Sequence, residues 1–363
     1  MHSTAIDRRT FLTLAGASLL PVRPARADEQ ALFLGARLNG DKFEAAVVDE
    51  AGADRLVLPL EARGHSFAID LPRGQAVAFA RSPGRFAVAF DVAGRTEPVA
   101  IAATPGRHFF GHGIFTPDGR LMLATESDYE GERGVTGIYD ATDGFRRIGE
   151  LDTAGIGPHE VLLMPDGRTA CVANGGILTH PDYDRLKLNI DTMKPSIAYL
   201  DIATGEVVEQ VELAPELHKL SIRHMVLDAA GAVWFGCQYE GEPGDRPPLV
   251  GRHRRGRAPE LFTGGAGTLR GLDNYVGSMA IDRAGEVIAT SSPRGGMVAF
   301  WDAATGRHLG DRSLADVCGV APLAKGHVLA TSGRGDMADM TPDRQSPLTG
   351  PAGVQWDNHL RRL

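Results

Sequence analysis

A repeated unit limits the fold of this chain more than any other feature of its sequence. The stretch GHGIFTPDGRLMLATE, Gly111 to Glu126, is followed by the similar stretch PHEVLLMPDGRTACVANGG, Pro158 to Gly176. Each copy holds a His, an apolar run, a turn with Pro, Asp and Gly, and a second apolar run. Four further copies lie at Gly64–Arg85, Ile222–Gln238, Val276–Leu314 and Val317–Asp336. The chain therefore repeats one structural unit along most of its length.

The repeat predicts an all-β fold, a β-propeller. The longest copy, Val276–Leu314, continues into a third strand, an Ala-Thr-Gly turn and a fourth strand. Four short antiparallel strands in each repeat of roughly 40 to 55 residues are typical of propeller blades, whereas a β-sandwich does not repeat at this period. We predict seven blades, with six as the alternative. Strand-like segments near the N-terminus and the C-terminal GVQWDNHLRRL lie outside the repeats, so we expect the two ends to share a blade.

The N-terminal segment is predicted to be an export signal. Arg8 and Arg9 precede an apolar stretch, Phe11–Leu20, and Ala25-Arg26-Ala27 forms a small-x-small cleavage site. The pattern predicts a cleaved twin-arginine signal over residues 1–27, one propeller domain over residues 28–363, and localisation in the periplasm. No later apolar run is long enough to anchor the mature chain in a membrane.

The charge of the chain argues against a nucleic-acid partner. The whole sequence has a formal net charge of −8, and the predicted signal removes four Arg and one Asp, which leaves −11. Nucleic-acid binding normally needs a basic surface. The three Cys are too far apart in sequence for a metal motif. Buried core thiols are the favoured interpretation, and a disulfide in the oxidising periplasm is the alternative.

Propeller geometry predicts that residues distant in sequence meet at one mouth of the central channel. The innermost strand of each blade starts at the face to which the second strand returns. Residues at the start of each first strand and at the end of each second strand therefore lie on the same face of the ring. The C-terminal strand and the segment LDNY before a first strand add further polar groups. The predicted ligand-binding residues at this mouth are His65, His112, Glu126, His159, Glu160, Asn174, His224, Gln238, Asp273, Asn274, Arg294, Arg334 and His359.

Four of these residues are predicted metal ligands: His112, His159, Glu160 and His224. Imidazole with carboxylate suits Fe, Zn, Mn or Cu, so the expected cofactor is a transition metal such as iron. Two alternatives stay open. Polar groups at a wet channel mouth also hydrogen-bond water, and the Arg294–Arg334 pair suits a carboxylate or phosphate group.

Two long loops are predicted on the same face, at Gly175–Ser196 and Tyr239–Glu260. Long loops on a rigid scaffold are often lids or contact surfaces. The second loop holds a basic run, Arg252–Arg257, which suits either an acidic partner or solvent.

Several motifs resemble those of the bacterial domain-of-unknown-function family 1513. They include GIGPHEVLLMPDGRTACVANGGI, LNIDTMKPS, VWFGCQYEG, RPPLVGRHRRG and NYVGSMAIDRAGEVIATSSPRGG. The resemblance covers nearly all of the mature chain and implies an exported propeller, similar more widely to seven-bladed lactonase-like and YVTN propellers. It implies no catalytic residues. It does imply an association with iron acquisition and with imelysin-like and di-haem oxidoreductase-like periplasmic partners.

The sequence thus favours a periplasmic ligand- or metal-binding accessory protein in iron acquisition. One alternative is a protein-interaction platform that uses the two long loops. The other is a metal-assisted, lactonase-like hydrolase with Glu160, Asn174 and Asp273 as ligands and a His as general base.

Overall fold

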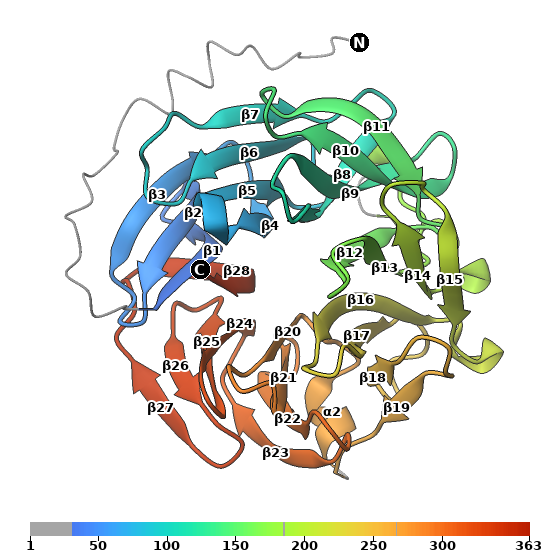
Figure 1. Cartoon of the computed structure of the whole chain (residues 1–363). Coiled ribbons are helices and arrows are strands. Elements are labelled where there is room, and N and C mark those ends of the chain that lie inside the picture. The colour runs from blue at the N-terminus through green and yellow to red at the C-terminus, as the bar shows by residue number, and fades with distance from the viewer. Residues whose placement is uncertain (1–30, 184–185, 266) are drawn as a thin grey trace.

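The computed structural model describes residues 31–363 except 184–185 and 266. The predicted export signal, residues 1–27, lies outside these residues. In the described part of the chain, seven four-stranded antiparallel sheets stand in a closed ring around a central axis (Figure 1). The all-β, seven-bladed prediction is confirmed. None of the helices among the described residues combines the length and apolar character needed to cross a membrane.

The blades follow one another in chain order, each from its innermost strand outward. Blade 1 contains β28 (Val354–Arg362), β1 (Leu32–Asn39), β2 (Lys42–Asp49) and β3 (Asp54–Leu60). Blade 2 contains β4 (Gly64–Asp70), β5 (Gln75–Ala80), β6 (Phe86–Asp91) and β7 (Val99–Ala102). Blade 3 contains β8 (Arg107–Phe115), β9 (Leu121–Asp128), β10 (Arg133–Asp140) and β11 (Arg146–Asp152). Blade 4 contains β12 (Pro158–Leu163), β13 (Thr169–Asn174), β14 (Ser196–Asp201) and β15 (Val207–Glu212).

The remaining blades complete the ring. Blade 5 contains β16 (Leu220–Leu227), β17 (Val233–Tyr239), β18 (Val250–His253) and β19 (Glu260–Phe262). Blade 6 contains β20 (Ser278–Ile281), β21 (Val287–Ser292), β22 (Met297–Asp302) and β23 (His308–Ser313). Blade 7 contains β24 (Val317–Ala324), β25 (His327–Ser332), β26 (Met337–Met340) and β27 (Gln345–Leu348). Short helices lie in the connections: η1 (Leu71–Arg73), η2 (Pro181–Tyr183), η3 (Ile190–Thr192), η4 (Pro215–Leu217) and α2 (Thr268–Leu272).

The two ends of the chain close the ring within blade 1. The C-terminal strand β28 pairs antiparallel with β1, with Phe33 opposite Arg362 and Asn39 opposite Val354. The predicted shared blade is confirmed. Because β28 is the innermost strand of its blade, the C-terminal residues reach the central channel.

The turn between the first two strands of blade 5, Asp228 to Gly231, shows why the repeat has Asp and Gly at this place. In blade 5 the Asp228 carboxylate accepts hydrogen bonds from the backbone N–H groups of Ala230 and Ala232, and Gly231 adopts a φ of +75°. A side chain is disfavoured at such a φ, so glycine fits there. The turn joins two strands whose apolar side chains, among them Trp234 and Phe235, are fully buried between blades.

The predicted loop from Tyr239 to Glu260 is shorter than the sequence suggested. Val250 is fully buried and Val250–His253 pairs with β17 as strand β18, so only the first part of the segment is loop. The basic run Arg252–Arg257 begins inside β18 and lies at the other end of the blade. Arg252 packs on the Trp234 ring and pairs with Glu260, and the Arg254 guanidinium lies 3.9 Å from Asp228 at the β16–β17 turn. That turn is at the opposite end of the blade from Gln238, which corrects the prediction that this run shares the histidine face.

Candidate metal centre

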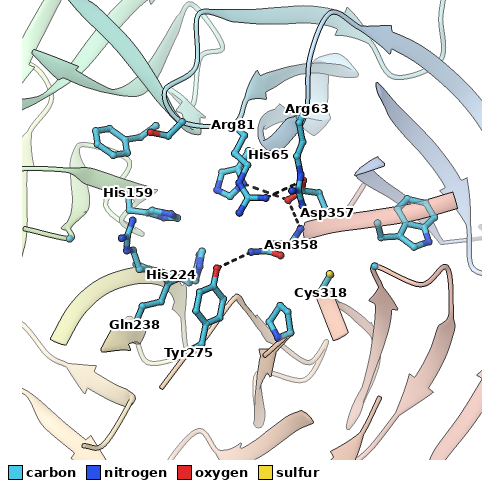
Figure 2. Close-up of a pocket in the computed structure, with 18 of the residues that line it drawn as sticks. Arg63, His65, Arg81, His159, His224, Gln238, Tyr275, Cys318, Asp357 and Asn358 are labelled. Atoms are coloured by element: carbon cyan, nitrogen blue, oxygen red, sulfur yellow. Dashed lines mark hydrogen bonds and ion pairs between the residues drawn. The ribbon is translucent and has the colours of Figure 1, made fainter. Parts of the chain in front are cut away.

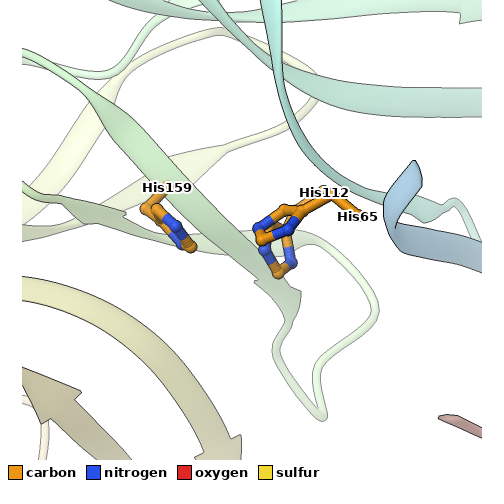
Figure 3. A group of neighbouring side chains, drawn as sticks. All are labelled: His65, His112 and His159. Atoms are coloured by element: carbon orange, nitrogen blue, oxygen red, sulfur yellow. The ribbon is translucent and has the colours of Figure 1, made fainter. Parts of the chain in front are cut away.

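Five histidines from five blades meet in the central channel. They come from innermost strands, and their ring centroids are 4.5 Å apart for His65 and His359 and 6.1 Å apart for His112 and His224. Figure 2 shows three of them around one cavity, and Figure 3 shows how closely the first three rings lie. We call this group the histidine cluster: His65 (β4), His112 (β8), His159 (β12), His224 (β16) and His359 (β28).

Irregular strand pairing places these histidines in the channel. In each of the five inner strands the register with its neighbour shifts at or beside the histidine. Of the two inner strands without such a His, β20 pairs with β21 without a shift, whereas the pairing of β24 with β25 also shifts. A β-bulge bends the strand and redirects a side chain. The shifts lie at Gly64–Phe67, Phe109–Gly113, Pro158–Glu160 and Ile222–His224. In β28 the shift lies at the residues opposite Gly35–Arg37 of β1.

Gly111 allows the rings to approach one another. Its φ is +106°, and a Cβ atom at this position would lie 2.5 Å from Cδ2 of His65. No other residue type fits without displacing the His65 ring or the backbone. The Gly-His pair in the repeated motif is therefore part of the site.

The histidine cluster is buried and short of hydrogen-bond partners. Every ring is at most 7% exposed. Both ring nitrogens of His112 and His224, Nδ1 of His65 and His159, and Nε2 of His359 are buried without a hydrogen bond. Nδ1 of His65, His112 and His224 each lie within 4 Å of a carboxylate, which leaves Nε2 of His112, His224 and His359 and Nδ1 of His159. A buried polar atom without a partner costs about 1–3 kcal/mol, so these four nitrogens are the candidate donors to a ligand.

Burial also fixes the protonation state of the rings. It lowers the pKa of His65 to about 3 and that of His224 to about 4, and it lowers the pKa of His112, His159 and His359 as well. At neutral pH the five imidazoles are therefore uncharged. Each neutral ring keeps one nitrogen lone pair that a metal ion can accept.

Glu160 lies behind two of the rings and orients them. Its carboxylate oxygens lie 3.5 Å from His112 Nδ1 and 3.7 Å from His224 Nδ1. Oε2 accepts a 2.8 Å hydrogen bond from the Met225 backbone N–H, and Oε1 is paired with the Arg361 guanidinium. Burial would raise the pKa of Glu160, but Arg361 and His112 hold it well below its usual value. A carboxylate facing Nδ1 leaves Nε2 of each ring to bind metal, as is common around metal-binding histidines.

Asp357 has the matching position beside His65. One carboxylate oxygen lies 3.9 Å from His65 Nδ1, and the other is paired with the Arg63 guanidinium. Burial raises the pKa of Asp357, but His65 and Arg63 outweigh it and lower the pKa to about 2. This carboxylate is therefore charged and can orient His65.

The donor atoms are spaced closely enough to hold a metal ion. Within the triad His65–His112–His159, and within the triad His112–His224–His359, the candidate nitrogens lie within 4.8 Å of one another. Ligands about 2.1 Å from a tetrahedral ion lie about 3.4 Å apart, so small ring rotations would complete either triad. A set of imidazole ligands suits Fe, Cu, Zn or Ni.

A cavity of about 790 Å³ opens on one side of the histidine cluster (Figure 2). His65, His159 and His224 contribute to its wall, together with Tyr275 and Cys318. Its lining holds more basic than acidic side chains: Arg37, Arg63, Arg81, Lys187, Arg223 and Arg294 against Asp316 and Asp357. Some of these cations are paired with carboxylates outside the lining, Arg37 with Glu44 and Asp54, and Lys187 with Glu240. The histidine cluster thus borders a cavity with more basic than acidic side chains in its wall.

The structure brings together most, but not all, of the predicted site residues. The five histidines and Glu160 form one group, and Gln238 and Arg294 line the cavity. Glu126 instead bonds to Tyr139 and Arg147 within blade 3, and Asn174 donates to the Thr153 carbonyl within blade 4. Asn274 donates to the Pro243 carbonyl, and Asp273 and Arg334 are exposed. Glu160, Asn174 and Asp273 therefore do not form the ligand set proposed for a lactonase-like site.

Sequence reasoning missed the two charged residues of β28 that support the histidine cluster. Asp357, His359 and Arg361 alternate along an innermost strand, and alternate residues face the same side of a strand. The alternation would have indicated Asp357 and Arg361 once the C-terminal segment was assigned as an inner strand. Of the two predicted long loops, Gly175–Ser196 does reach the cavity, through Ile177, Thr179 and Lys187.

The three cysteines are free and buried, as the core-thiol interpretation predicted. Burial raises the pKa of Cys318 to about 12, so this thiol is protonated at neutral pH. Although Cys318 lines the cavity, it is therefore a poor metal ligand in this state.

Comparison with known proteins agrees with this architecture. A family model described as "Protein of unknown function (DUF1513)" matches residues 58–363. The chain belongs to the DUF1513 family. A search of curated protein sequences found no match for this DUF1513 protein.

Solved structures resemble this DUF1513 propeller in fold alone. Among the 1198 matching chains is one described as "Kuenenia stuttgartiensis Hydrazine Synthase". It is 14% identical, with a TM-score of 0.60, and the alignment covers 87% of this chain and 96% of that chain. A fold shared so widely does not specify a function, so the function must be inferred from the site.

Proposed function

We propose that this DUF1513 protein is an exported periplasmic metal-binding propeller that serves iron acquisition, with its metal bound by the histidine cluster. The observation that carries the proposal is the set of buried imidazole nitrogens without hydrogen bonds. Polar atoms buried for structural reasons are nearly always paired. A transition metal would supply the missing partner for several of these nitrogens at once.

The arrangement around the rings supports the same conclusion. Glu160 faces two Nδ1 atoms and Asp357 faces a third, and both carboxylates are held by arginines. Such outer carboxylates fix the orientation of metal-binding rings. Because the cavity borders one side of the cluster, an ion has a route in and a side open to an outside ligand.

The iron-acquisition role and the periplasmic location rest on different support. The paired arginines Arg8 and Arg9 before an apolar stretch favour export by the twin-arginine pathway. The resemblance to family members associated with imelysin-like and di-haem oxidoreductase-like proteins favours iron as the metal and such proteins as partners. Imidazole ligands are compatible with iron.

Metal analysis of the purified mature protein tests the proposal. The native protein and a His112→Ala/His224→Ala variant would be stripped with chelator and titrated with Fe²⁺, Co²⁺, Zn²⁺ and Cu²⁺ under anaerobic conditions. We expect the native protein to bind metal in defined stoichiometry and the variant to bind at least 100-fold more weakly, because both triads lose His112. Equal binding by the two proteins, or none by a folded native protein, would contradict the proposal.

A further inference from the structure

The charges around the histidine cluster do not neutralise a divalent ion. The five imidazoles are neutral ligands, and the negative charge of Glu160 is already paired with Arg361. Asp357 is likewise paired with Arg63. A metal ion bound here would therefore leave about two positive charges buried without compensation, which is unfavourable. The missing negative charge has to come from outside the protein.

The cavity is suited to hold an anion that would supply this negative charge. It borders the cluster through three histidines, and its lining holds six cationic side chains and two carboxylates. Arg37 and Lys187 are already paired with carboxylates outside the lining, so an anion would be held by the other cations, Arg294 above all. Its volume of about 790 Å³ is far larger than a single hydroxide or chloride needs, and it lies within the usual range for small-molecule sites, roughly 300–1,000 Å³. A small organic anion with more than one negative charge matches both the size and the lining.

Arg294 is the cation in this lining that is best placed to bind such an anion. Its guanidinium lies over the Tyr275 ring, 4.6 Å from the centroid, and among the described residues no carboxylate is paired with it. The ring holds the side chain at the cavity wall and leaves its N–H groups for a ligand. Guanidinium groups bind carboxylates through paired hydrogen bonds.

We propose that the cavity binds a small polycarboxylate anion, and that one of its carboxylates completes the coordination of the metal held by the histidine cluster. The inference rests on the proposed metal centre and names the outside ligand of that site. The same bound state can form in two ways. A polycarboxylate can add to protein that already holds metal, or a metal–polycarboxylate complex can enter as a unit.

The neighbouring blade provides a matched control for Arg294. Arg334 follows the second strand of blade 7, as Arg294 follows that of blade 6, and both are exposed, but only Arg294 lines the cavity. The test would load native, Arg294→Gln and Arg334→Gln proteins with Co²⁺, whose visible spectrum reports its ligands, and titrate each with citrate.

We expect citrate to change the cobalt spectrum to saturation, with an affinity about tenfold lower in Arg294→Gln and unchanged in Arg334→Gln. Glycerol, a neutral molecule, should have no effect. Mixing apoprotein with preformed cobalt–citrate distinguishes the two sources: uptake of both components together supports entry as a complex, and uptake of cobalt first supports later addition.

Several results would overturn the inference. They are an unchanged spectrum in cobalt-loaded protein, equal losses in the two variants, and an identical response to inorganic phosphate at the same concentration. If the native protein bound no cobalt, the proposed metal function would fail, and calorimetry of apoprotein with citrate would decide the anion site alone. Binding that depends on Arg294 would then support that site, and absence of binding would overturn it.

Discussion

Blade 3 and the central channel each bury a cluster of ionisable side chains, and the two clusters differ in how far the protein satisfies them. In blade 3, every carboxylate oxygen of Glu126 and Glu150 accepts a hydrogen bond, from Tyr139 or from an arginine. In the channel, seven ring nitrogens of the histidine cluster have no hydrogen bond. The paired cluster stabilises its own blade, whereas the unpaired nitrogens of the channel are the observation on which the proposed metal site rests.

Metal removal should have the largest effect on stability, and this effect should depend on the histidine cluster in the channel. A ligand present at 1,000 times its Kd stabilises the folded state by about 4 kcal/mol. We expect chelation to lower the free energy of unfolding of native protein by about this amount, measured by urea denaturation with and without metal. The His112→Ala/His224→Ala variant should show no such change. A metal effect of equal size in this variant would mean that the stabilising ion binds elsewhere.

Glu126→Ala should have a similar effect on stability with no effect on the metal. The substitution removes the buried partner of Arg147 and Tyr139, and breaking a buried ion pair costs about 3 kcal/mol. Urea denaturation of the apoprotein measures this loss, and a metal titration of the same variant should give native stoichiometry and affinity. Loss of metal binding in folded Glu126→Ala protein would remove the distinction between the two clusters.

Glu160→Gln should weaken metal binding more than it weakens the fold. Glutamine keeps the shape but loses the charge that faces His112, His224 and Arg361. Loss of such an outer carboxylate typically lowers metal affinity by about 10- to 100-fold. Competition titration with a coloured chelator measures the change, with Glu126→Ala as the control. Unchanged affinity would show that Glu160 does not orient the rings.

Glu150→Gln should have the smallest effect and should depend on pH. Burial would raise the pKa of Glu150, but hydrogen bonds from Arg107, Arg147 and Arg133 lower it from 4.5 to about 2. A carboxyl group with a lowered pKa stabilises the fold above its unfolded-state pKa, and this stabilisation is lost as the pH falls toward 2. We expect the variant to be less stable by about 1 kcal/mol at pH 7.

The pH series separates this charge effect from a packing effect. Chemical denaturation of native and Glu150→Gln protein between pH 7 and pH 2 should show the difference in stability shrinking below about pH 4.5. A difference that stayed constant over this range would mean that the arginines do not act through the charge of Glu150.

The repeat was sufficient to predict the fold and part of the site. Its strand–turn–strand pattern predicted the blades, and aligned turn glycines placed His112 and His224 at equivalent inner positions. Glu126 was predicted on the same basis, but it faces into blade 3, because side-chain direction depends on the pleat and on local bulges. Asp357 and Arg361 lie outside the repeats, so alignment of the repeats could not identify them.

Anomalous diffraction from crystals of metal-loaded mature protein tests the central claim most directly. We expect an anomalous peak at the metal absorption edge inside the channel, with at least three nitrogens of the histidine cluster about 2.0–2.2 Å from the ion. A fully loaded protein whose anomalous peaks all lie outside the channel, with water molecules hydrogen-bonded to these five rings, would contradict the account.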